Sequence, residues 1–406
     1  MKKLYLLLDE WDNDRNFVGR ELDRICDEYD VTVICNSASV MLNPKAEYAV
    51  YEKPGKGPAL FSLLKMVFDR GAWAEVGRVL REDKNKAGRL SEAVRFYVNA
   101  DLFAAFMDKR GFFKDNAIYY SYWYFWKCYA VTRRIDKLKG SRVITRTHEY
   151  DMYDYTSPSG YQPFKVPMDE KLDAVVFIAE HGRDYYLKKY GLKAGDKYKL
   201  YRLGTMDPSK DSKVNVIPEH KGTDAFTLVS CSSVIPRKRV KRIAEALALI
   251  DDIKIRWIHF GTGDLFDDLK ETCKKLLDDK GNIEYDLKGY VKNEELHDYY
   301  RNTYVDAFIT ASSSEGNPVS VMEALSYGIP VIAPCVCNFP NMINDCGLLT
   351  SADCSASELA DRVKELASMD ETGMYEFRKS ARKCWEDKFN ADVNTDRFIS
   401  EVLKTL

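Results

Sequence analysis

Two glutamates, Glu315 and Glu323, stand on either side of a proline with seven residues between them. The residues between them read as the start of a helix, whose first N–H groups, here those of Val319 and Ser320, have no acceptor inside the helix. Such amides favour an anion such as a phosphate. Carboxylates do not bind phosphate but accept hydrogen bonds from hydroxyls, so one suits a ribose and the other a sugar. This combination indicates a site for a nucleotide sugar.

Local signals predict the elements that hold this pair. Residues 305–311 form a short, mostly apolar run that ends in serines, which predicts a buried strand. We expect Asn317 as the N-cap of a helix and Pro318 at its first position, where the missing N–H is no loss. The helix is expected to end at Tyr327, with Gly328 in the C′ position and another strand after it. This order presents the amides at the carboxyl end of a sheet, where α/β proteins bind ligands.

The stretch EGNPVSVMEALSYGIPVIAP, residues 315–334, resembles the signature of retaining GT-B glycosyltransferases of family 4. The resemblance implies an α/β protein with two Rossmann-like domains that face each other across a cleft. It also implies a nucleoside diphosphate sugar as donor, with UDP or GDP, and neither a cofactor nor a metal ion. The donor-binding positions that it marks are Gly316, Asn317, Pro318, Val319 and Ser320. The alternative is an ordinary crossover connection with two surface glutamates.

A second segment, residues 226–242, resembles the other donor signature of the family, an arginine followed five residues later by a lysine. Lys238 takes the position of the lysine, whereas Ser233 stands where the arginine is usual. Arg237 or Arg239 is left to supply the second charge. Cations are needed because negative charge grows on the diphosphate as the glycosidic bond breaks, and a fixed cation stabilises that charge more than the ground state. The alternative is a basic entry to the following helix.

Three further segments resemble family positions around the same ligand. Gly261 opens a G-T-G after a predicted strand, which is weak support for a phosphate loop when taken alone. Tyr290 and Val291 correspond to the loop against which the nucleobase lies. His148 stands in RTHEYDMY, which resembles the R-x-H-x-x-D-x-Y segment of family members that build surface polysaccharides. This histidine is expected to face the reacting carbon of the sugar.

The resemblance gives catalytic roles to Glu315, Lys238 and His148. Glu315 is expected to hold the hydroxyls of the donor sugar, Lys238 the leaving diphosphate and His148 the developing positive sugar, while Glu323 binds the ribose. The diphosphate takes the proton of the acceptor, a saccharide or lipid-linked saccharide as in bacterial surface polysaccharide or glycan synthesis, and the anomeric configuration is kept. Two other functions stay open: another GT-B nucleotide-sugar enzyme such as an epimerase, and a catalytically silent subunit that binds a donor or a partner.

The length of 406 residues favours two domains, each large enough for its own core. A strand, a helix over residues 16–29 and a second strand predict a parallel sheet near the N-terminus. We expect an acceptor-side domain over residues 1–205 and a nucleotide-sugar domain over 206–388. A terminal helix within 389–406 is expected to pack back on the first domain. The loop after the first strand carries Gly19 alone, where many family members have a Gly-Gly pair.

Although the net charge of the chain is only −2, one region is strongly basic. Residues 53–142 hold 19 Lys and Arg against 9 Asp and Glu. Within it, residues 60–110 alternate apolar and basic positions at helical spacing. No nucleic-acid-binding module accompanies this charge, so it favours the anionic face of a membrane, with solvated helix faces as the alternative. The aromatic stretch 117–130 predicts a strand and then a helix near a bilayer or a partner, and core packing is the alternative for most of its rings.

The cysteines and the N-terminus bear on location. Ten cysteines follow no regular framework, which favours reduced thiols, and the first apolar run is too short for a signal-peptide core. The expectation is a cytoplasmic protein, peripheral on the inner face of the cell membrane where the basic region makes contact.

Overall fold

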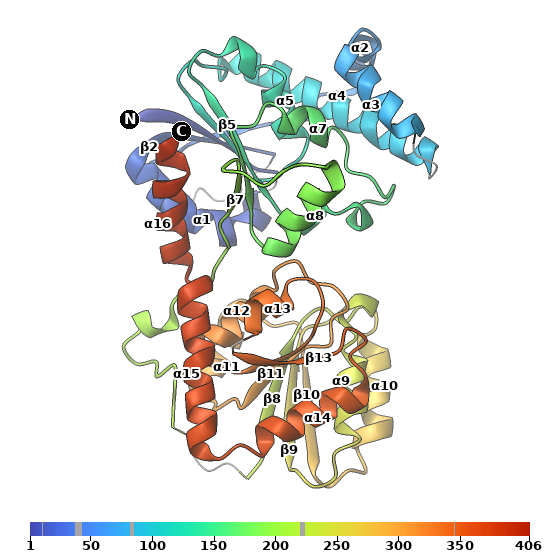
Figure 1. Cartoon of the computed structure of the whole chain (residues 1–406), viewed down its shortest axis with the longest axis vertical. Coiled ribbons are helices and arrows are strands. Elements are labelled where there is room, and N and C mark those ends of the chain that lie inside the picture. The colour runs from blue at the N-terminus through green and yellow to red at the C-terminus, as the bar shows by residue number, and fades with distance from the viewer. Residues whose placement is uncertain (10, 37–42, 82–84, 220–223, 345) are drawn as a thin grey trace. The chain divides into compact units, whose positions relative to one another are not determined.

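The computed structural model describes residues 1–9, 11–36, 43–81, 85–219, 224–344 and 346–406, with the backbone alone at 11–17 and 20. The chain forms two compact units (Figure 1). The first comprises Met1–Arg202 together with Thr395–Leu406, and the second comprises Leu203–Asn394. Each unit is built on one parallel sheet with helices on both faces, so the predicted fold class, two Rossmann-like α/β domains, is confirmed.

The sheet of the first unit has the strand order β3-β2-β1-β4-β5-β6-β7. Its strands are short apolar runs rather than alternating ones, because both faces of a parallel sheet are covered. The strands are β1 (Lys2–Leu7), β2 (Tyr29–Cys35), β3 (Glu47–Val50), β4 (Ile118–Ser121), β5 (Arg142–Thr147), β6 (Ala174–Phe177) and β7 (Tyr198–Leu200).

One apolar layer of this unit contains α4 and α5, and the layer on the other face of the sheet contains α1 and α16. The helix predicted to begin at Asn16 begins at Trp11. The helices are α1 (Trp11–Glu28), α2 (Lys56–Val67), α3 (Arg70–Arg81), α4 (Lys86–Arg110), α5 (Trp126–Thr132), α6 (Glu149–Met152), α7 (Lys165–Asp169), α8 (Glu180–Tyr190) and α16 (Ala391–Glu401).

The terminal helix α16 completes the core of the first unit. Phe398, Ile399 and Val402 are buried and pack in the same cluster as the side chains of β1 and β2. Phe398 also covers the guanidinium of Arg146, which lies 4.6 Å from the ring centroid and forms a buried ion pair with Glu21. Arg146, which the sequence places beside the candidate His148, therefore has a structural partner inside this core.

The aromatic stretch 117–130 forms β4 and α5, as predicted, and most of its rings are core residues. Tyr119, Tyr120, Tyr122 and Tyr124 are all buried. Their burial removes them as contacts for a bilayer. Among the residues that the structure describes, no helix is both long enough and apolar enough to cross a membrane.

The sheet of the second unit has the order β10-β9-β8-β11-β12-β13. Helices α9, α10 and α14 share one apolar cluster with the sheet, and α11, α12, α13 and α15 share the other. The strands are β8 (Phe226–Cys231), β9 (Ile255–Phe260), β10 (Ile283–Gly289), β11 (Ala307–Ile309), β12 (Val331–Pro334) and β13 (Gly347–Thr350). The helices are α9 (Lys241–Leu247), α10 (Phe266–Leu277), α11 (Asn293–Asn302), α12 (Val319–Ser326), α13 (Phe339–Ile343), α14 (Ala356–Ala367) and α15 (Glu371–Lys388).

In both sheets the order in which strands are added along the chain reverses beside the first strand of the unit. In the first unit β1 pairs with β2 on one side and with β4 on the other. In the second unit β8 pairs in the same way with β9 and β11. The loops that leave the two inner strands diverge at such a point, and the crevice between them at the carboxyl ends is where open α/β sheets bind ligands.

Candidate functional site

The crevice of the second sheet brings together a lysine and a glutamate. Lys238 follows β8 and Glu315 follows β11, and the ammonium group of Lys238 donates to Oε1 of Glu315 in a direct ion pair. The hydroxyl of Ser312 donates to the same oxygen at 2.6 Å. The lysine and glutamate side chains are 15% and 8% exposed, so most of the pair is removed from water. Two residues that the sequence assigns to separate parts of a donor are thus in contact.

The arginines beside Lys238 hold the loop that carries Glu315. Arg237 donates through Nη1 to the carbonyl of Ser314 at 3.0 Å, and its own carbonyl accepts from the N–H of Ser313 at 2.8 Å. Arg239 donates through Nε to the carbonyl of Ala311 at 2.6 Å. Both guanidinium groups are bonded to main-chain carbonyls. Lys238, between them, faces the carboxylate of Glu315.

Helix α12 begins one residue later than the sequence predicts. Pro318 has φ −67° and ψ 115°, so it is the N-cap, and Val319 is the first helical residue. Asn317, predicted as the N-cap, lies outside this position because the extended ψ of Pro318 turns the chain before the helix starts. The carbonyl of Pro318 accepts from the N–H groups of Val321 at 3.2 Å and Met322 at 3.3 Å. The N–H groups of Val319 and Ser320 belong to the first turn, which has no intrahelical acceptor for them.

The end of α12 confirms the prediction for Gly328. Tyr327 is the C-cap and Gly328 has φ +60°, the left-handed conformation that glycine adopts without strain. The N–H of Ile329 returns to the carbonyl of Ala324 at 3.1 Å. The helix is therefore fixed at its C-terminus and leaves its N-terminus, with Gly316 and Pro318 before it, beside the crevice.

Glu323 projects from α12 toward α11. Its Oε1 accepts from Nδ2 of Asn293 at 2.8 Å and lies 3.6 Å from Nε2 of His297. Nδ1 of His297 is 3.1 Å from the hydroxyl of Tyr327. Burial, with the negative charge of Glu323 adding to it, raises the pKa of the Cys231 thiol at the end of β8 to about 12. The residues that sequence reasoning missed here are Asn293 and His297, whose only signal is their place in the helix after the Gly-Tyr-Val loop.

The loops after β8, β9 and β10 are joined by main-chain contacts. Gly261 has φ +137°, and a Cβ at this position would lie 1.9 Å from the carbonyl oxygen of Ser232. Its N–H donates to the carbonyl of Gly289 at 2.8 Å. Tyr290 is 79% exposed, and Val291 packs partly buried against the core. Glycine is thus required at 261 for the close approach of two loops, and Tyr290 presents a free ring face at the same edge of the sheet.

His148 lies in the first unit, directly after β5. It is the N-cap of α6, and its main-chain N–H donates to Oδ1 of Asp151 at 2.7 Å. The imidazole is 4.2 Å from the ring of Trp123 and 4.9 Å from that of Tyr122, residues that follow β4. Both ring nitrogens are buried, and neither has a hydrogen-bond partner among the described residues. Nδ1 of the imidazole lies 3.7 Å from Oδ2 of Asp151, and the ring lies beside the crevice of the first sheet.

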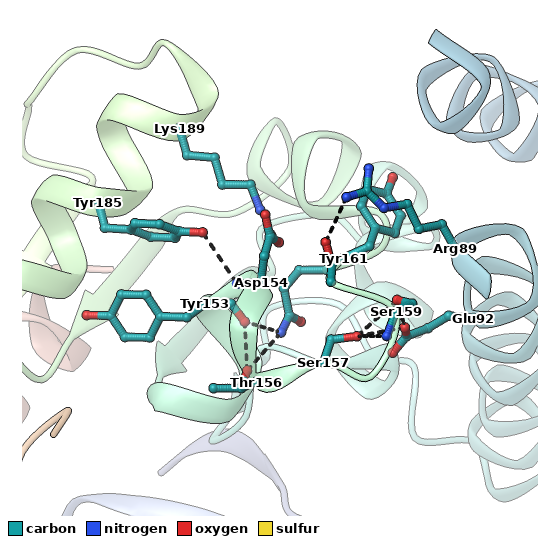
Figure 2. A network of polar contacts seen from close by, with 12 residues as sticks. Arg89, Glu92, Tyr153, Asp154, Thr156, Ser157, Ser159, Tyr161, Tyr185 and Lys189 are labelled. Atoms are coloured by element: carbon teal, nitrogen blue, oxygen red, sulfur yellow. Dashed lines mark hydrogen bonds and ion pairs between the residues drawn. The ribbon is translucent and has the colours of Figure 1, made fainter. Parts of the chain in front are cut away.

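The segment after His148 is fixed by polar contacts to two helices (Figure 2). Lys189 of α8 forms an ion pair with Asp154. Glu92 of α4 accepts from the hydroxyl of Ser157 at 2.7 Å. Further contacts join Tyr185 to Asp154, Ser159 to Glu92, and Arg89 to the carbonyl of Gly160. Because residues 154–160 are held from both sides, the short helix α6 and its N-cap have a defined position.

A cavity of about 510 Å³ lies in the first unit at the carboxyl ends of β2 and β3. Two aromatic rings and two amides are among its lining residues, which are Asn36, Tyr51, Glu52, Lys53, Asn99 and Trp126. The hydroxyl of Tyr51 is buried and has no hydrogen-bond partner in the described part of the chain. Aromatic faces beside amides suit a polar, hydroxyl-rich ligand. Sequence reasoning missed this cavity because its residues come from four separate segments.

Metal-ion ligands do not gather in this protein as far as the structure describes it. No group of three or more His, Cys, Asp or Glu side chains in those residues is arranged to hold a metal ion.

Solved structures identify the class of the fold. The chain superimposes over its whole length on the apo form of the lipopolysaccharide outer core galactosyltransferase WaaB, with a TM-score of 0.69 and 13% identity and 100% of both chains covered. It also matches Anabaena Alr3699/HepE in complex with UDP and glucose, with a TM-score of 0.64, 14% identity and the same coverage. The protein has a GT-B fold.

The match to a sequence family lies within the second unit. Residues 213–383 match the family described as Glycosyl transferases group 1. This stretch contains Lys238, Glu315 and Glu323. Over 121 residues the chain is 31% identical to the alpha-monoglucosyldiacylglycerol synthase of Streptococcus pneumoniae (strain ATCC BAA-255 / R6), which is 29% of this chain and 26% of that protein. The match thus spans about a quarter of the curated relative.

Proposed function

We propose that this protein is a retaining glycosyltransferase that moves a hexose from a nucleoside diphosphate sugar to the hydroxyl of a saccharide acceptor. The observation that carries the proposal is the Lys238–Glu315 ion pair at the crevice between β8 and β11, beside the free N-terminal turn of α12. A cation, a row of main-chain amides and a carboxylate are what a diphosphate and a sugar hydroxyl require. All three lie within the stretch that matches the glycosyl transferases of group 1.

The donor is proposed to exchange partners with this ion pair. In the ligand-free protein Lys238 and Glu315 neutralise each other. A bound diphosphate competes for Lys238, and Glu315 is then free to accept hydrogen bonds from the hydroxyls of the sugar. Glu323 is proposed to bind the ribose and the loop of Tyr290 and Val291 the base. We propose UDP as the nucleotide, on the support of the HepE structure, whose ligands are UDP and glucose.

In the reaction, the bond between the anomeric carbon and the diphosphate oxygen breaks, and both electrons stay on the diphosphate. The acceptor oxygen attacks the same face of the sugar, and its proton passes to an oxygen of the leaving diphosphate, so the anomeric configuration is kept. Lys238 and the amides of Val319 and Ser320 stabilise the charge that develops on the leaving group, which is the role proposed for them in place of a metal ion. His148 is proposed to face the developing positive sugar.

The acceptor is proposed to be a saccharide or a lipid-linked saccharide, bound through the first unit. The support is the cavity lined by Tyr51, Asn99 and Trp126, whose rings and amides suit a sugar. We also propose that the protein works on the cytoplasmic side of a membrane, in contact with the lipid, in the synthesis of a surface glycan.

The first experiment is a thermal-shift screen of the purified protein with UDP-, GDP- and ADP-sugars, because a ligand that binds the native state raises the melting temperature. UDP-hexoses are expected to give the largest shift. Release of UDP and transfer of the hexose are then followed by chromatography, with the anomeric configuration of the product read by NMR. Glu315→Ala is expected to lower turnover by orders of magnitude, whereas Lys241→Ala, an exposed lysine of α9, is the control.

Three results would overturn the proposal. An epimer formed from the nucleotide sugar without acceptor would identify an epimerase. Binding without transfer or hydrolysis would identify a silent donor-binding subunit. Wild-type transfer by Glu315→Ala would remove the role given to that carboxylate.

A further inference from the structure

Helix α2 turns its apolar side toward solvent. It buries Ser62 and Met66 only, whereas five large apolar side chains are 54–86% exposed: Leu60, Phe61, Leu64, Val67 and Phe68. At 3.6 residues per turn these five occupy less than half of the circumference, on the side away from Ser62. A helix that serves only the core of its own domain has the opposite arrangement.

This orientation is fixed by a buried carboxylate. Asp101 of α4 is 4% exposed and accepts from the hydroxyl of Ser62 at 2.8 Å and from the ammonium of Lys65 at 2.9 Å. Nη1 of Arg133 lies 3.7 Å from its other oxygen. Rotation of α2 to bury the apolar side would leave Asp101 without its partners from this helix, and a buried charge that loses its partners is strongly destabilising. The outward apolar side is therefore part of the folded state.

Helix α3 extends the same surface. The indole N–H of Trp73 donates to the carbonyl of Val67 at the end of α2, at 2.8 Å, while the side chain is 57% exposed. A tryptophan whose N–H is satisfied and whose ring is exposed is typical of the boundary between water and lipid. The docking face is defined as Leu60, Phe61, Leu64, Val67, Phe68 and Trp73.

Basic residues surround the docking face. Residues 53–81 contain six basic side chains, Lys53, Lys56, Lys65, Arg70, Arg78 and Arg81, and two acidic ones, Asp69 and Glu75. Both acids already have partners: Asp69 forms an ion pair with Arg133 at 2.7 Å, and Glu75 is buried against Arg78. Lys53, Lys56, Arg70 and Arg81 are exposed. The surface is therefore apolar at its centre and positive around it.

We infer that the docking face inserts into the interfacial region of an anionic lipid bilayer, with the surrounding lysines and arginines on the lipid phosphates. An apolar helix face with a basic surround is the pattern of helices that lie in the plane of a membrane surface. A second copy of the chain is the poorer occupant, because a two-fold contact sets each patch against itself and brings the same cations together. This inference deepens the proposed function and rests on it for the acceptor side, but lipid binding is measurable without any sugar.

The test is flotation of the full chain with vesicles of phosphatidylcholine, with and without phosphatidylglycerol. The wild type is expected to float with the anionic vesicles. Phe61→Ser together with Phe68→Ser is expected to weaken this binding at least about tenfold, because two large apolar side chains no longer leave water. The matched control is Leu249→Ser with Val393→Ser, which changes side chains outside the docking face that are 52% and 46% exposed and leaves vesicle binding unchanged.

A second variant separates charge from apolar contact. Lys56→Glu with Arg70→Glu is expected to reduce binding to anionic vesicles to the level of neutral ones, and 0.5 M salt to weaken the wild type in the same direction. Failure of the wild type to bind anionic vesicles, or wild-type binding by the double serine variant, would overturn the inference. So would a dimer, by light scattering, that the serine variant converts to a monomer. The UDP thermal shift of the serine variant stays as in the wild type, so failure here is distinguishable from failure of the proposed donor site.

Discussion

Replacement of Glu315 by glutamine is expected to make the protein bind UDP more tightly while it transfers sugar more slowly. In the ligand-free state Lys238 is paired with Glu315, and the two side chains are 15% and 8% exposed. A diphosphate must draw Lys238 away from this carboxylate and then sit near its negative charge. Glu315→Gln keeps the size and a hydrogen-bonding oxygen for Ser312 but removes the charge. Both obstacles to nucleotide binding are thereby reduced.

The size of the effect follows from Coulomb's law. Two unit charges about 6 Å apart at an effective dielectric constant of about 20 interact by about 3 kcal/mol. About half of this is lost when water and the new partner of Lys238 relax around the site, which leaves about 1.4 kcal/mol, or a tenfold lower Kd for UDP. Turnover is expected to fall by at least about a hundredfold, because the glutamine no longer holds the donor sugar as a carboxylate does.

Calorimetric titration with UDP measures the affinity, and single-turnover transfer measures the rate. Glu323→Gln is the matched control, because Glu323 is also 8% exposed but contacts Asn293 and His297 instead of a lysine. It is expected to bind UDP more weakly, as a lost ribose contact requires. Thermal melting checks that both variants fold. An unchanged or raised Kd for Glu315→Gln would show that Lys238 does not receive the diphosphate, and the proposed partner exchange would then be wrong.

Three further predictions concern the same unit. Lys238→Ala is expected to lower kcat by at least about a hundredfold and UDP affinity by less, because its contribution grows as charge develops; equal losses in both would contradict this. Gly261→Ala is expected to lower the free energy of unfolding in urea by about 3 kcal/mol, because its Cβ would lie 1.9 Å from the carbonyl of Ser232 at φ +137°, whereas Gly281→Ala, with no atom within 4 Å, serves as the control. Burial lowers the pKa of His259 from 6.5 to about 4. The unfolded chain therefore binds a proton that the folded chain does not as the pH falls from 6.5 to 4, and the free energy of unfolding drops over this window by up to about 3 kcal/mol. His259→Asn should remove that part of the slope in urea unfolding at pH 7 and pH 4.5, and an unchanged slope would exclude His259 as its source.

Local sequence signals were enough to predict many helices and strands of the second unit. The apolar run at residues 226–231 forms β8, and the helix expected after the basic segment is α9, which begins at Lys241. The C-terminus of α12 follows from Gly328, because the left-handed conformation there suits glycine alone. The predicted N-terminus of α12 was wrong by one residue. Proline fixes φ but leaves ψ free, and ψ decides whether the helix has begun.

The arrangement of the site depends on information that a single stretch does not contain. Lys238 and Glu315 are 77 residues apart and meet because β11 pairs with β8, an order that the tertiary fold decides. The outward side of α2 has the same origin. The spacing of Leu60, Phe61 and Leu64 predicts an amphipathic helix, whose apolar side normally faces inward. Here Asp101, more than thirty positions away, binds the polar side instead.

The place of α16 in the core of the first unit bears on how the chain is made. Strands β1 and β2 emerge early from the ribosome, but the apolar side chains that cover them, Phe398, Ile399 and Val402, emerge last. Until then the nascent unit exposes the apolar surface that this helix will later cover, and the second unit is synthesised in the meantime. Such an intermediate is prone to aggregate and is a natural client for chaperones. Expression at low temperature, which slows aggregation of the waiting half, should therefore raise the yield of native protein.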